Sequence, residues 1–448
     1  MPRALRSRLS QIALAFLRHF PRLRIAVRKA YWSLRERNYR KLAQAIPVDA
    51  QTVFFESYGG RSYACSPKAI FEALCEDKRF SDWRFIWSLR AEAAEAAVRE
   101  NPLLAMRARI VAQGSAEHLK ACATAGYWIV NNRVAEWIYP KDGQTYVQCW
   151  HGTPLKRLGF DVRIQTNAAL NTTSELAWRF GLDAQKWSYL LAPSPFTSEH
   201  LASAFGLKPA ARAQLIIEEG YPRNDRISTT LASPRRDEEI RTLKQRLDIP
   251  PDRKVLLYTP TWRDSDYQSG VGYVAKGLLD LQQMKEALGS DWVVLLRLHY
   301  YIANQLATGE LKGFAYDVCA VQDINDLYLI ADALLTDYSS TVFDYANTNR
   351  PLIYYWPDFK EYAEQVRGFY FDPTTLPGDQ CTTTEGVIQA LCALPTWHER
   401  HATAYQAFRQ RFCSKDDGQA SPRVIAQIFA HVNPACPHAR MASNNPKA

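Results

Sequence analysis

Short apolar runs alternate with stretches of helical periodicity from about residue 51 onward. This alternation is typical of parallel α/β sheets, in which each buried strand is followed by a covering helix. The predicted strands of the first half are Thr52–Ser57, Phe85–Leu89, Tyr127–Asn131, Tyr146–Trp150 and Tyr189–Ala192. Those of the second half are Leu215–Glu218, Val255–Tyr258, Trp292–Leu296, Ala333–Thr336 and Leu352–Tyr355. The pattern therefore predicts an α/β protein with two similar, Rossmann-like halves that face a cleft.

A hinge between the halves is expected at Gly220–Asp225, which precedes a polar stretch to Arg236. The segment Ala307–Phe314 is expected to be a loop or a short helix. The predicted organisation is a leader (1–45), an N-terminal α/β domain (46–215), a C-terminal α/β domain (216–375), C-terminal helices (376–436) and a disordered tail (437–448).

The positive charge of the chain is concentrated in the leader. Residues 1–40 contain ten Arg and one Lys against a single acid, Glu36, whereas the whole chain has a net charge of +9. A helix from about Ala4 to Phe20 would carry an apolar stripe, and a second basic and apolar stretch, Leu23–Trp32, follows Pro21. No run reaches the length of a transmembrane span. The leader is expected to lie on an anionic membrane surface, and a helix docked on the protein's own body is the alternative.

Nine cysteines, odd in number and without a CxxC pair, favour reduced thiols over a disulfide framework. Outside the leader the chain shows no basic groove, which argues against a nucleic-acid partner.

The clearest candidate chemistry follows the predicted strand Tyr146–Trp150. His151 comes directly after it, Gly152 would allow close approach of a ligand, and Lys156 and Arg157 could bind an anion. Because ligands bind at the carboxyl ends of strands in open α/β sheets, His151 is a candidate general base. The alternative is a histidine that merely ends a strand before a proline turn.

A second candidate lies at the end of the run Trp292–Leu296. By the two-residue alternation of an extended strand, Arg297 and His299 point the same way. A cation and an imidazole at this position suit a phosphate-bearing ligand. An arginine–acid ion pair beside a packed histidine is the alternative.

A third candidate begins after the apolar strand Ala333–Thr336. Ser339 and Ser340 are expected to cap a helix that starts at about Thr341, where free N–H groups favour phosphate. Asp344, one turn into that helix, could accept a hydrogen bond from a ribose hydroxyl.

A fourth stretch, Tyr258–Asp264, adds hydroxyls, the aromatic Trp262 and the cation Arg263. The sequence Asp264-Ser265-Asp266 mimics a DxD metal motif, but it lies in a polar loop with no partner ligand nearby. Zinc spacings, phosphate-loop motifs and the GxSxG hydrolase motif are absent from the sequence.

Taken in order, these stretches resemble the CDP-glycerol glycerophosphotransferase family, whose members build teichoic acids and related capsule polymers. The resemblance spans roughly residues 51 to 375 and includes Phe55-Glu56-Ser57 with Gly59, Tyr127-Trp128-Ile129 with Asn131, His151 to Lys156, Gly220 to Asp225, Tyr258 to Asp264, Arg297 to His299, Asp323 to Asp344, Arg350-Pro351 and Arg367 to Asp372. One departure is Ser57-Tyr58-Gly59-Gly60-Arg61, where the family often has Ser-Phe-His-Gly-Lys. That departure bears on contacts near the acceptor.

The resemblance implies a two-domain GT-B fold with the donor nucleotide mostly in the C-terminal domain. It also implies transfer of glycerol phosphate from CDP-glycerol to a hydroxyl of a membrane-anchored, lipid-linked acceptor or growing chain, with release of CMP. The expected location is peripheral, on the cytoplasmic face of the membrane. The rivals are a CDP-ribitol phosphotransferase, a glycosyltransferase that uses a nucleotide sugar and, least favoured, a non-enzymatic binding module.

In the expected mechanism His151 takes the proton of the attacking hydroxyl, while Arg297, His299 and the serine pair stabilise the departing phosphate. Neither a cofactor nor an obligatory metal is expected. The candidate donor-binding residues are Thr259, Arg263, Asp337, Ser339, Ser340 and Asp344. The candidate residues on the acceptor or phosphate side are Glu56, Gly152, Thr153 and Lys156.

Overall fold

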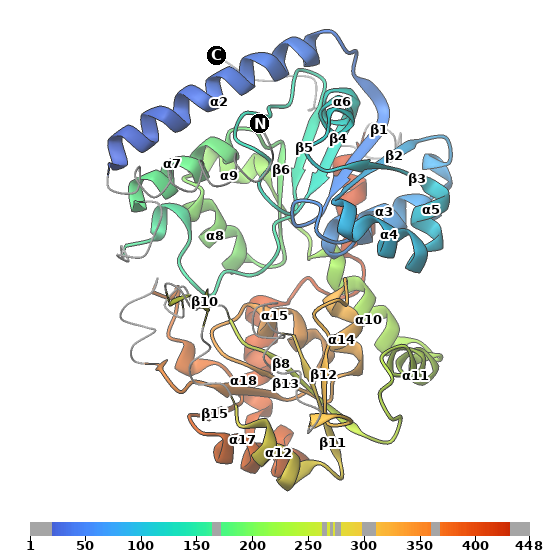
Figure 1. Cartoon of the computed structure of the whole chain (residues 1–448), viewed down its shortest axis with the longest axis vertical. Coiled ribbons are helices and arrows are strands. Elements are labelled where there is room, and N and C mark those ends of the chain that lie inside the picture. The colour runs from blue at the N-terminus through green and yellow to red at the C-terminus, as the bar shows by residue number, and fades with distance from the viewer. Residues whose placement is uncertain are drawn as a thin grey trace.

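The computed structural model describes residues 20–163, 172–261, 267–268, 272–273, 279–297, 311–359 and 368–430. These residues form two α/β domains, stacked along the long axis of the molecule in Figure 1. The connection between them passes through Gly220–Asp225, the expected hinge.

The N-terminal sheet has seven parallel strands in the order β3-β2-β1-β4-β5-β6-β7. The strands are β1 (Asp49–Glu56), β2 (Arg84–Leu89), β3 (Ala108–Ala112), β4 (Ala125–Val130), β5 (Thr145–Gln148), β6 (Tyr189–Ala192) and β7 (Ile216–Glu218). The strand order reverses between β1 and β4, and such a reversal opens a ligand crevice at the carboxyl ends of the strands.

The C-terminal sheet repeats this arrangement with six parallel strands in the order β12-β11-β8-β13-β14-β15. They are β8 (Lys254–Thr259), β11 (Trp292–Leu296), β12 (Ala315–Asp317), β13 (Ala333–Thr336), β14 (Leu352–Tyr355) and β15 (Asp379–Cys381). A separate two-stranded ribbon consists of β9 (Tyr267–Gln268) and β10 (Gly272–Tyr273).

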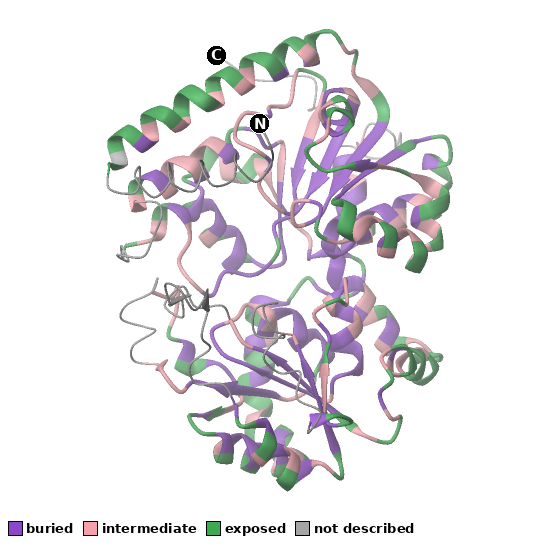
Figure 2. Cartoon of the chain, viewed as in Figure 1, coloured by how far each residue is buried: buried purple, intermediate pink, exposed green. Residues whose placement is uncertain are grey.

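Each sheet is buried on both faces, as Figure 2 shows for the central strands. Neighbouring residues of β1 divide between two cores, with Val53 and Phe55 on one face and Phe54 on the other. Leu257 and Leu256 of β8 divide in the same way. Helices cover both faces, which is why these strands read as continuous apolar runs rather than alternating ones.

The helices of the N-terminal domain are α2 (Pro21–Gln44), α3 (Cys65–Glu76), α4 (Ala91–Glu100), α5 (Pro102–Arg107), α6 (Ala116–Thr124), α7 (Thr173–Ala184), α8 (Pro195–Ala204) and α9 (Pro209–Leu215). Those that follow the hinge are α10 (Asp225–Ala232), α11 (Arg236–Arg246), α12 (Leu281–Leu288), α14 (Ile324–Ile330), α15 (Thr341–Tyr345), α17 (Thr384–Cys392), α18 (Trp397–Phe412) and α19 (Ala420–Ile428). The last of these returns to the first domain, where Val424 and Phe429 enter the core beneath α3.

The predicted α/β class with two Rossmann-like sheets is confirmed. The sheet limits differ from the expected domain limits, because β7 pairs with β6 and carries the N-terminal sheet past residue 215. Likewise β15 pairs with β14 and carries the second sheet past residue 375. The predicted helix over residues 4–20 and the predicted tail lie outside the described residues, apart from Phe20.

Helix α2 contains the basic and apolar stretch Leu23–Trp32 and docks on the N-terminal domain. Arg24 and Arg28 form ion pairs with the buried carboxylate of Glu175, and Trp32 stacks on Trp178 with ring centroids 5.5 Å apart. The expected alternative, docking on the protein's own body, therefore holds for one face of this helix. Within the described part of the chain, no helix is both long and apolar enough to cross a bilayer.

Candidate functional site

A cavity of about 430 Å³ lies between the two domains, at the carboxyl ends of both sheets. The residues that line it and come from the N-terminal domain include Tyr58, Arg61, Cys65 and His151. Those from the hinge and the C-terminal domain include Arg223, Arg297, Asp323, Asn325, Tyr328, Ser340, Thr341 and Asp344. Four residues predicted from three separate motifs, His151, Arg297, and Ser340 with Asp344, are thus brought together around one space.

The imidazole of His151 is fixed by a backbone contact. Its Nδ1 atom lies 2.8 Å from the carbonyl oxygen of Asn131, which follows β4. The residue is solvent-exposed at the cavity surface, yet surrounding protein atoms remove enough hydration to lower the pKa of His151 to about 4. The hydrogen bond to Asn131 opposes this shift, and nearby guanidinium groups add to it. The ring is therefore neutral at pH 7, as a general base requires.

Backbone strain is concentrated around this histidine. Tyr58, Cys65 and Trp150 line or adjoin the cavity and have left-handed φ values of 51°, 66° and 50°. Such conformations cost free energy in residues other than glycine and persist where the surrounding structure holds them. The indole of Trp150 packs on the His151 ring with centroids 4.4 Å apart. The strand end that presents His151 is thus held in one geometry.

Gly152 and Ser340 meet across the cleft. A Cβ atom on Gly152 would lie 2.9 Å from the Ser340 Oγ atom, so a side chain there would require the Ser340 hydroxyl to move. Ser340 is the N-cap residue of α15, as expected, but its side chain makes no capping bond. Arg297, which also lines the cavity, is held by the carbonyl oxygens of Val318 and Val321, at 3.2 and 2.7 Å.

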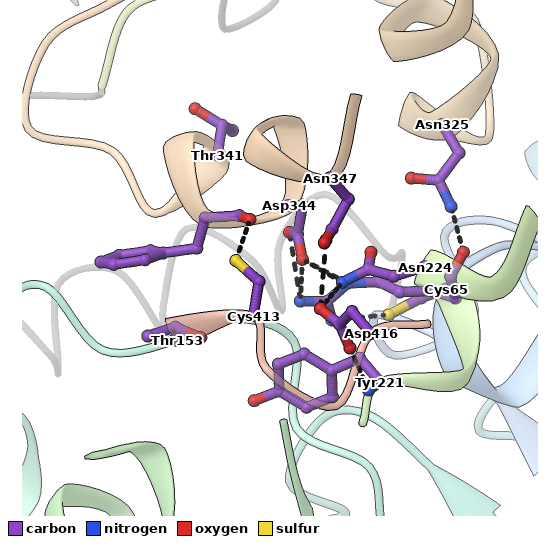
Figure 3. Close-up of polar contacts among 12 residues, drawn as sticks. Cys65, Thr153, Tyr221, Asn224, Asn325, Thr341, Asp344, Asn347, Cys413 and Asp416 are labelled. Atoms are coloured by element: carbon purple, nitrogen blue, oxygen red, sulfur yellow. Dashed lines mark hydrogen bonds and ion pairs between the residues drawn. The ribbon is translucent and has the colours of Figure 1, made fainter. Parts of the chain in front are cut away.

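The hinge contributes a buried cation to the site. The guanidinium of Arg223 donates to Asp344 at 2.8 Å, and Asn224 donates to the same carboxylate at 3.1 Å. Burial alone would lower the pKa of Arg223, but the Asp344 carboxylate outweighs it and the pKa lies well above its ordinary value. The carboxylate expected to hold a ribose is thus already engaged by the hinge (Figure 3).

A second carboxylate fastens the hinge to the C-terminal return segment. Asp416, between α18 and α19, accepts hydrogen bonds from Tyr221 N–H at 2.8 Å, Asn224 at 2.7 Å and Asn347 at 3.1 Å (Figure 3). Burial raises the pKa of Asp416 to about 7. Gly220 has a φ of +99°, and a Cβ atom on it would lie 2.5 Å from the carbonyl oxygen of Lys415. The hydrogen bonds of Asp416 hold the hinge close to the segment between α18 and α19, and the absence of a side chain at Gly220 permits this approach.

Direct contacts between the domains flank the cavity. On one side the Lys68 ammonium of α3 pairs with Asp323, the N-cap residue of α14, at 2.8 Å, and both side chains are buried. On the other side the backbone of Leu155–Arg157 bonds to that of Gly368–Tyr370, with N···O distances of 3.0 and 3.1 Å. The cavity therefore has walls from both domains.

Three residues predicted for the donor side lie just outside the cavity lining. The Thr259 hydroxyl lies 3.1 Å from that of Thr336 and 3.3 Å from that of Thr341. Asp337 is buried and accepts hydrogen bonds from the backbone and side chain of Thr261 at 2.8 to 2.9 Å, which fixes the loop after β8. Ser339 accepts from Thr341 N–H at 3.3 Å.

The residues predicted for the acceptor side divide between the cleft and the core. Gly152 faces the cleft, whereas Thr153 is buried against Thr197. Lys156 forms a backbone bridge to Phe369.

Glu56 lies in the N-terminal domain, where it accepts a hydrogen bond from Ser88 at 2.7 Å and lies 3.4 Å from His118 Nε2. Burial lowers the pKa of His118, but Cys122 and Glu56 outweigh it and raise the pKa to about 10, so the pair is ionic. Glu56 is not among the residues that line the cavity, and its assignment to the acceptor side stays a prediction.

Two candidate residues, Arg263 and His299, lie outside the described residues and stay predictions. Conversely, sequence reasoning missed Arg223 as a site residue, although it lies within the hinge motif. Its partner, Asp344, is 121 residues away in sequence.

The arrangement is that of a GT-B-type transferase, with two Rossmann-like domains and a site between the carboxyl ends of their sheets. The chain belongs to the CDP-glycerol:poly(glycerophosphate) glycerophosphotransferase family, whose sequence pattern matches residues 38–430.

Relatives and a solved structure agree with this assignment. The chain is 36% identical over 389 residues to the teichoic acid poly(glycerol phosphate) polymerase of Bacillus subtilis, covering 87% of this chain but 50% of that protein. It is 37% identical over 385 residues to the protein of that name from Bacillus spizizenii, covering 86% of this chain and 93% of the relative. The teichoic acid ribitol-phosphate primase of Bacillus spizizenii is 29% identical over 295 residues, covering 64% of this chain and 70% of that one.

A structure of a variant of the wall teichoic acid polymerase TagF, soaked with CDPG, superimposes with a TM-score of 0.76 and 32% identity. It covers 95% of this chain, and the alignment includes 98% of the TagF chain. The expected GT-B architecture is confirmed by this match.

Proposed function

We propose that this protein transfers glycerol phosphate from CDP-glycerol to a hydroxyl group of a lipid-linked acceptor or growing chain and releases CMP. The observation that carries the proposal is the cavity that brings His151 together with Arg297 and Ser340, in a chain of the glycerophosphotransferase family. The chain spans about half the length of the Bacillus subtilis relative, with 50% of that protein covered.

The acceptor hydroxyl attacks the β-phosphorus of CDP-glycerol in line with the bond to the departing CMP oxygen. A new P–O bond forms to the acceptor, and the P–O bond to CMP breaks. The Asn131 carbonyl oxygen can only accept, so His151 Nδ1 carries a hydrogen and Nε2 of the neutral ring is free to take the hydroxyl proton. This assigns His151 as the general base.

Charge that develops on the departing CMP phosphate needs positive partners. Arg297 is fixed by two backbone carbonyl oxygens, so its guanidinium needs little reorganisation when the phosphate charge grows. Ser340, which approaches Gly152 across the cleft, is available as a second partner for this phosphate. His299 and Arg263 are predicted to assist, and the chemistry needs no cofactor and no obligatory metal.

Glycerol phosphate is favoured over ribitol phosphate as the group that is transferred. Relatives named for glycerol phosphate reach 36–37% identity over 86–87% of the chain, whereas the ribitol-phosphate primase reaches 29% over 64%. The difference in coverage supports a CDP-glycerol donor, and CDP-ribitol is the rival to test.

Peripheral attachment to the cytoplasmic face of the membrane is proposed from helix α2. A stripe of large apolar side chains on the face turned away from the protein body consists of Phe20, Leu23, Val27, Tyr31 and Leu34, each 48–60% exposed. Exposed cations on the same helix, Arg22, Lys29, Arg37, Arg40 and Lys41, suit anionic headgroups. A helix of this kind inserts its apolar stripe between lipids while its cations remain at the headgroups.

The test is CMP release by purified protein with lipid acceptors, using CDP-glycerol, CDP-ribitol and common nucleotide sugars in parallel. The proposal predicts acceptor-dependent CMP release from CDP-glycerol at a rate at least tenfold above that from CDP-ribitol. Turnover with a nucleotide sugar alone would overturn the assigned reaction and leave the fold assignment in place.

A further inference from the structure

A second cavity, of about 630 Å³, lies on the N-terminal domain at the amino ends of its strands. The first residues of β1, β2 and β3, which are Asp49, Arg84 and Ala108, all line it. Helix α6 contributes another wall. The cavity that contains His151 lies at the carboxyl ends of the strands, so this amino-end cavity is a separate site, and the proposed reaction uses none of its residues.

Cations outnumber carboxylates in the amino-end cavity. The charged residues of its lining are Arg84, Arg107, Arg109 and Lys120 against Asp49 and Glu117. Asp49 pairs with Arg84, while Glu117 is shared by Arg109 at 2.9 Å and Lys120 at 3.0 Å. Both carboxylates are therefore already engaged, and the lining keeps an excess of positive charge.

Arg107 contributes a cation that has no carboxylate within ion-pair distance among the described residues. Its guanidinium donates to the carbonyl oxygens of Ser81 at 3.1 Å and Phe80 at 3.2 Å, and it lies 5.5 Å from the centroid of the Phe85 ring. The Nε atom of Arg107 is buried and has no hydrogen-bond partner in the described structure. Because removing a cation from water without a counter-ion costs free energy, this arginine favours an anionic ligand.

The rest of the lining is largely apolar. Trp83, Phe85 and Ile86 are buried residues of this lining, whereas Met106 is 75% exposed. The side chains of Arg84 and Arg109 are also exposed, at 67% and 65%. A cavity that combines apolar walls with exposed cations suits an amphiphile with an anionic headgroup better than it suits a small soluble anion.

The amino-end cavity adjoins the helix that is proposed to meet the membrane. Helix α2 ends at Gln44, and Ile46, two residues later, lines the cavity. Helix α6 also packs against α2. Figure 1 shows α2 and α6 at the end of the molecule farthest from the C-terminal domain. The cavity and the apolar stripe of α2 are thus neighbours on the same part of the N-terminal domain.

We infer that the amino-end cavity binds the headgroup phosphate of one anionic phospholipid. Arg84, Arg107 and Arg109 contact the phosphate, and the acyl chains leave past Met106. This inference rests on the proposed membrane attachment and deepens it, because it adds a site that selects the headgroup to a helix that inserts between lipids. The stripe of α2 responds to any lipid surface, whereas the cavity discriminates by charge.

The test is calorimetric titration of a monomeric lipid into the full chain. The probes are dihexanoylphosphatidylglycerol and the zwitterionic dihexanoylphosphatidylcholine, both kept below the concentration at which they form micelles. The proteins are the wild type and the double variant Arg84→Gln with Arg109→Gln. The matched control is Arg79→Gln with Arg99→Gln, which removes the same charge from two exposed, ion-paired arginines of this domain outside the cavity lining.

The wild type should bind one phosphatidylglycerol molecule per chain, at least tenfold more tightly than phosphatidylcholine. Losing charged hydrogen bonds to the phosphate should weaken this binding about tenfold to hundredfold in the Arg84 and Arg109 variant. The control should bind as the wild type does. The KM for CDP-glycerol should change less than about twofold in both double variants, which also shows that they are folded, because neither alters the cavity between the domains.

A further variant separates this inference from membrane attachment through α2. Leu23→Gln with Leu34→Gln should bind the monomeric lipid as the wild type does, because neither leucine lines the amino-end cavity. If the wild type sediments with phosphatidylglycerol vesicles but does not bind the monomeric lipid, the inference is overturned and the attachment stands. Binding of the monomeric lipid without sedimentation supports the headgroup site and contradicts the attachment.

Equal affinity of the wild type for the two lipids would also overturn the inference, as would equal affinity of the wild type and the Arg84 and Arg109 variant for phosphatidylglycerol. CMP release is measured separately. Its absence would contradict the proposed reaction and would leave the result of the titration unaffected.

Discussion

The Nδ1 atom of His151 lies 2.8 Å from the carbonyl oxygen of Asn131, whose side chain accepts the Tyr58 N–H at 2.7 Å. Asn131, a fully buried residue directly after β4, thus connects the segments that follow β1 and β5. The contact to His151 selects the tautomer, and the contact to Tyr58 fixes a turn with a left-handed backbone. The position of the base depends on a neighbour that is itself out of contact with solvent.

Replacement of the Asn131 side chain changes the contact to Tyr58 and the charge near His151, because the backbone carbonyl that contacts the imidazole is kept in each variant. Asn131→Ala leaves the Tyr58 N–H without its partner, and we expect a loss of about 1–3 kcal/mol in the free energy of unfolding. Asn131→Asp keeps an acceptor for Tyr58 and places a negative charge near His151, which raises the pKa of the imidazole. The acid limb of kcat/KM should therefore move to higher pH in the aspartate variant. Denaturant unfolding and pH–rate profiles measure the two outcomes, and identical profiles for Asn131→Asp and the wild type would contradict this role.

The pH dependence of the wild type follows from the low pKa of His151. Loss of hydration lowers that pKa from 6.5 to about 4, so the neutral, proton-accepting form persists well below pH 6.5. We expect kcat/KM to remain level as the pH falls from 8 through about 5 and to be lost as it passes through about 4. Rates at several pH values, with circular dichroism to confirm that the protein is folded, test this. A break near 6.5 would show a base with ordinary hydration.

The Arg223–Asp344 pair should be a stability element as well as part of the cavity. Both side chains are mostly buried, with 4% and 12% exposed, so Asp344→Ala leaves a guanidinium without its counter-ion. We expect a loss of about 3–5 kcal/mol in the free energy of unfolding. The double variant Arg223→Met with Asp344→Leu should lose less than Asp344→Ala, since no buried charge is left uncompensated. An unchanged unfolding midpoint for Asp344→Ala would show that the carboxylate is free for another partner, such as the predicted ribose.

Membrane attachment through α2 is tested on its exposed face. Leu23→Gln with Leu34→Gln removes two apolar contacts, each worth about 1.5–3 kcal/mol if fully inserted, so binding to vesicles containing phosphatidylglycerol should fall at least tenfold. Both side chains are exposed, so thermal stability should not change. The control is Ala26→Gln with Ser33→Gln, two exposed positions of α2 outside the stripe, which should bind as the wild type does. Equal cosedimentation of both double variants would contradict the assignment.

Much of the fold could be predicted because its central strands are buried on both faces. Trp292–Leu296, Ala333–Thr336 and Leu352–Tyr355 are continuous apolar runs, and their predicted limits agree with β11, β13 and β14. The strands of the two large sheets that were not predicted, β3, β12 and β15, lie at sheet edges. Their residues are partly exposed, as in Ala108–Ala112, so their composition carries a weaker signal.

The site residues could be predicted only where a polar or charged side chain follows a strand. His151, Arg297 and Ser340 each lie directly after a strand or cap the helix that follows one, and the parallel order of both sheets brings them together. Arg223 could not be assigned in this way, because its role depends on Asp344, 121 residues away. Glu56 was assigned to the acceptor side from a motif, but its pairing with His118 depends on packing that sequence does not reveal.

The most direct test of the account compares acceptor-dependent CMP release from saturating CDP-glycerol by the wild type, His151→Ala and His398→Ala. His398 is an exposed histidine on α18, remote in the fold from the cavity, and serves as the matched control. If His151 takes the proton of the attacking hydroxyl, its alanine variant should be slower by about 10²–10⁴-fold, and the His398 variant should be unchanged. A loss of less than about tenfold in folded His151→Ala would contradict the central claim that this histidine is the general base.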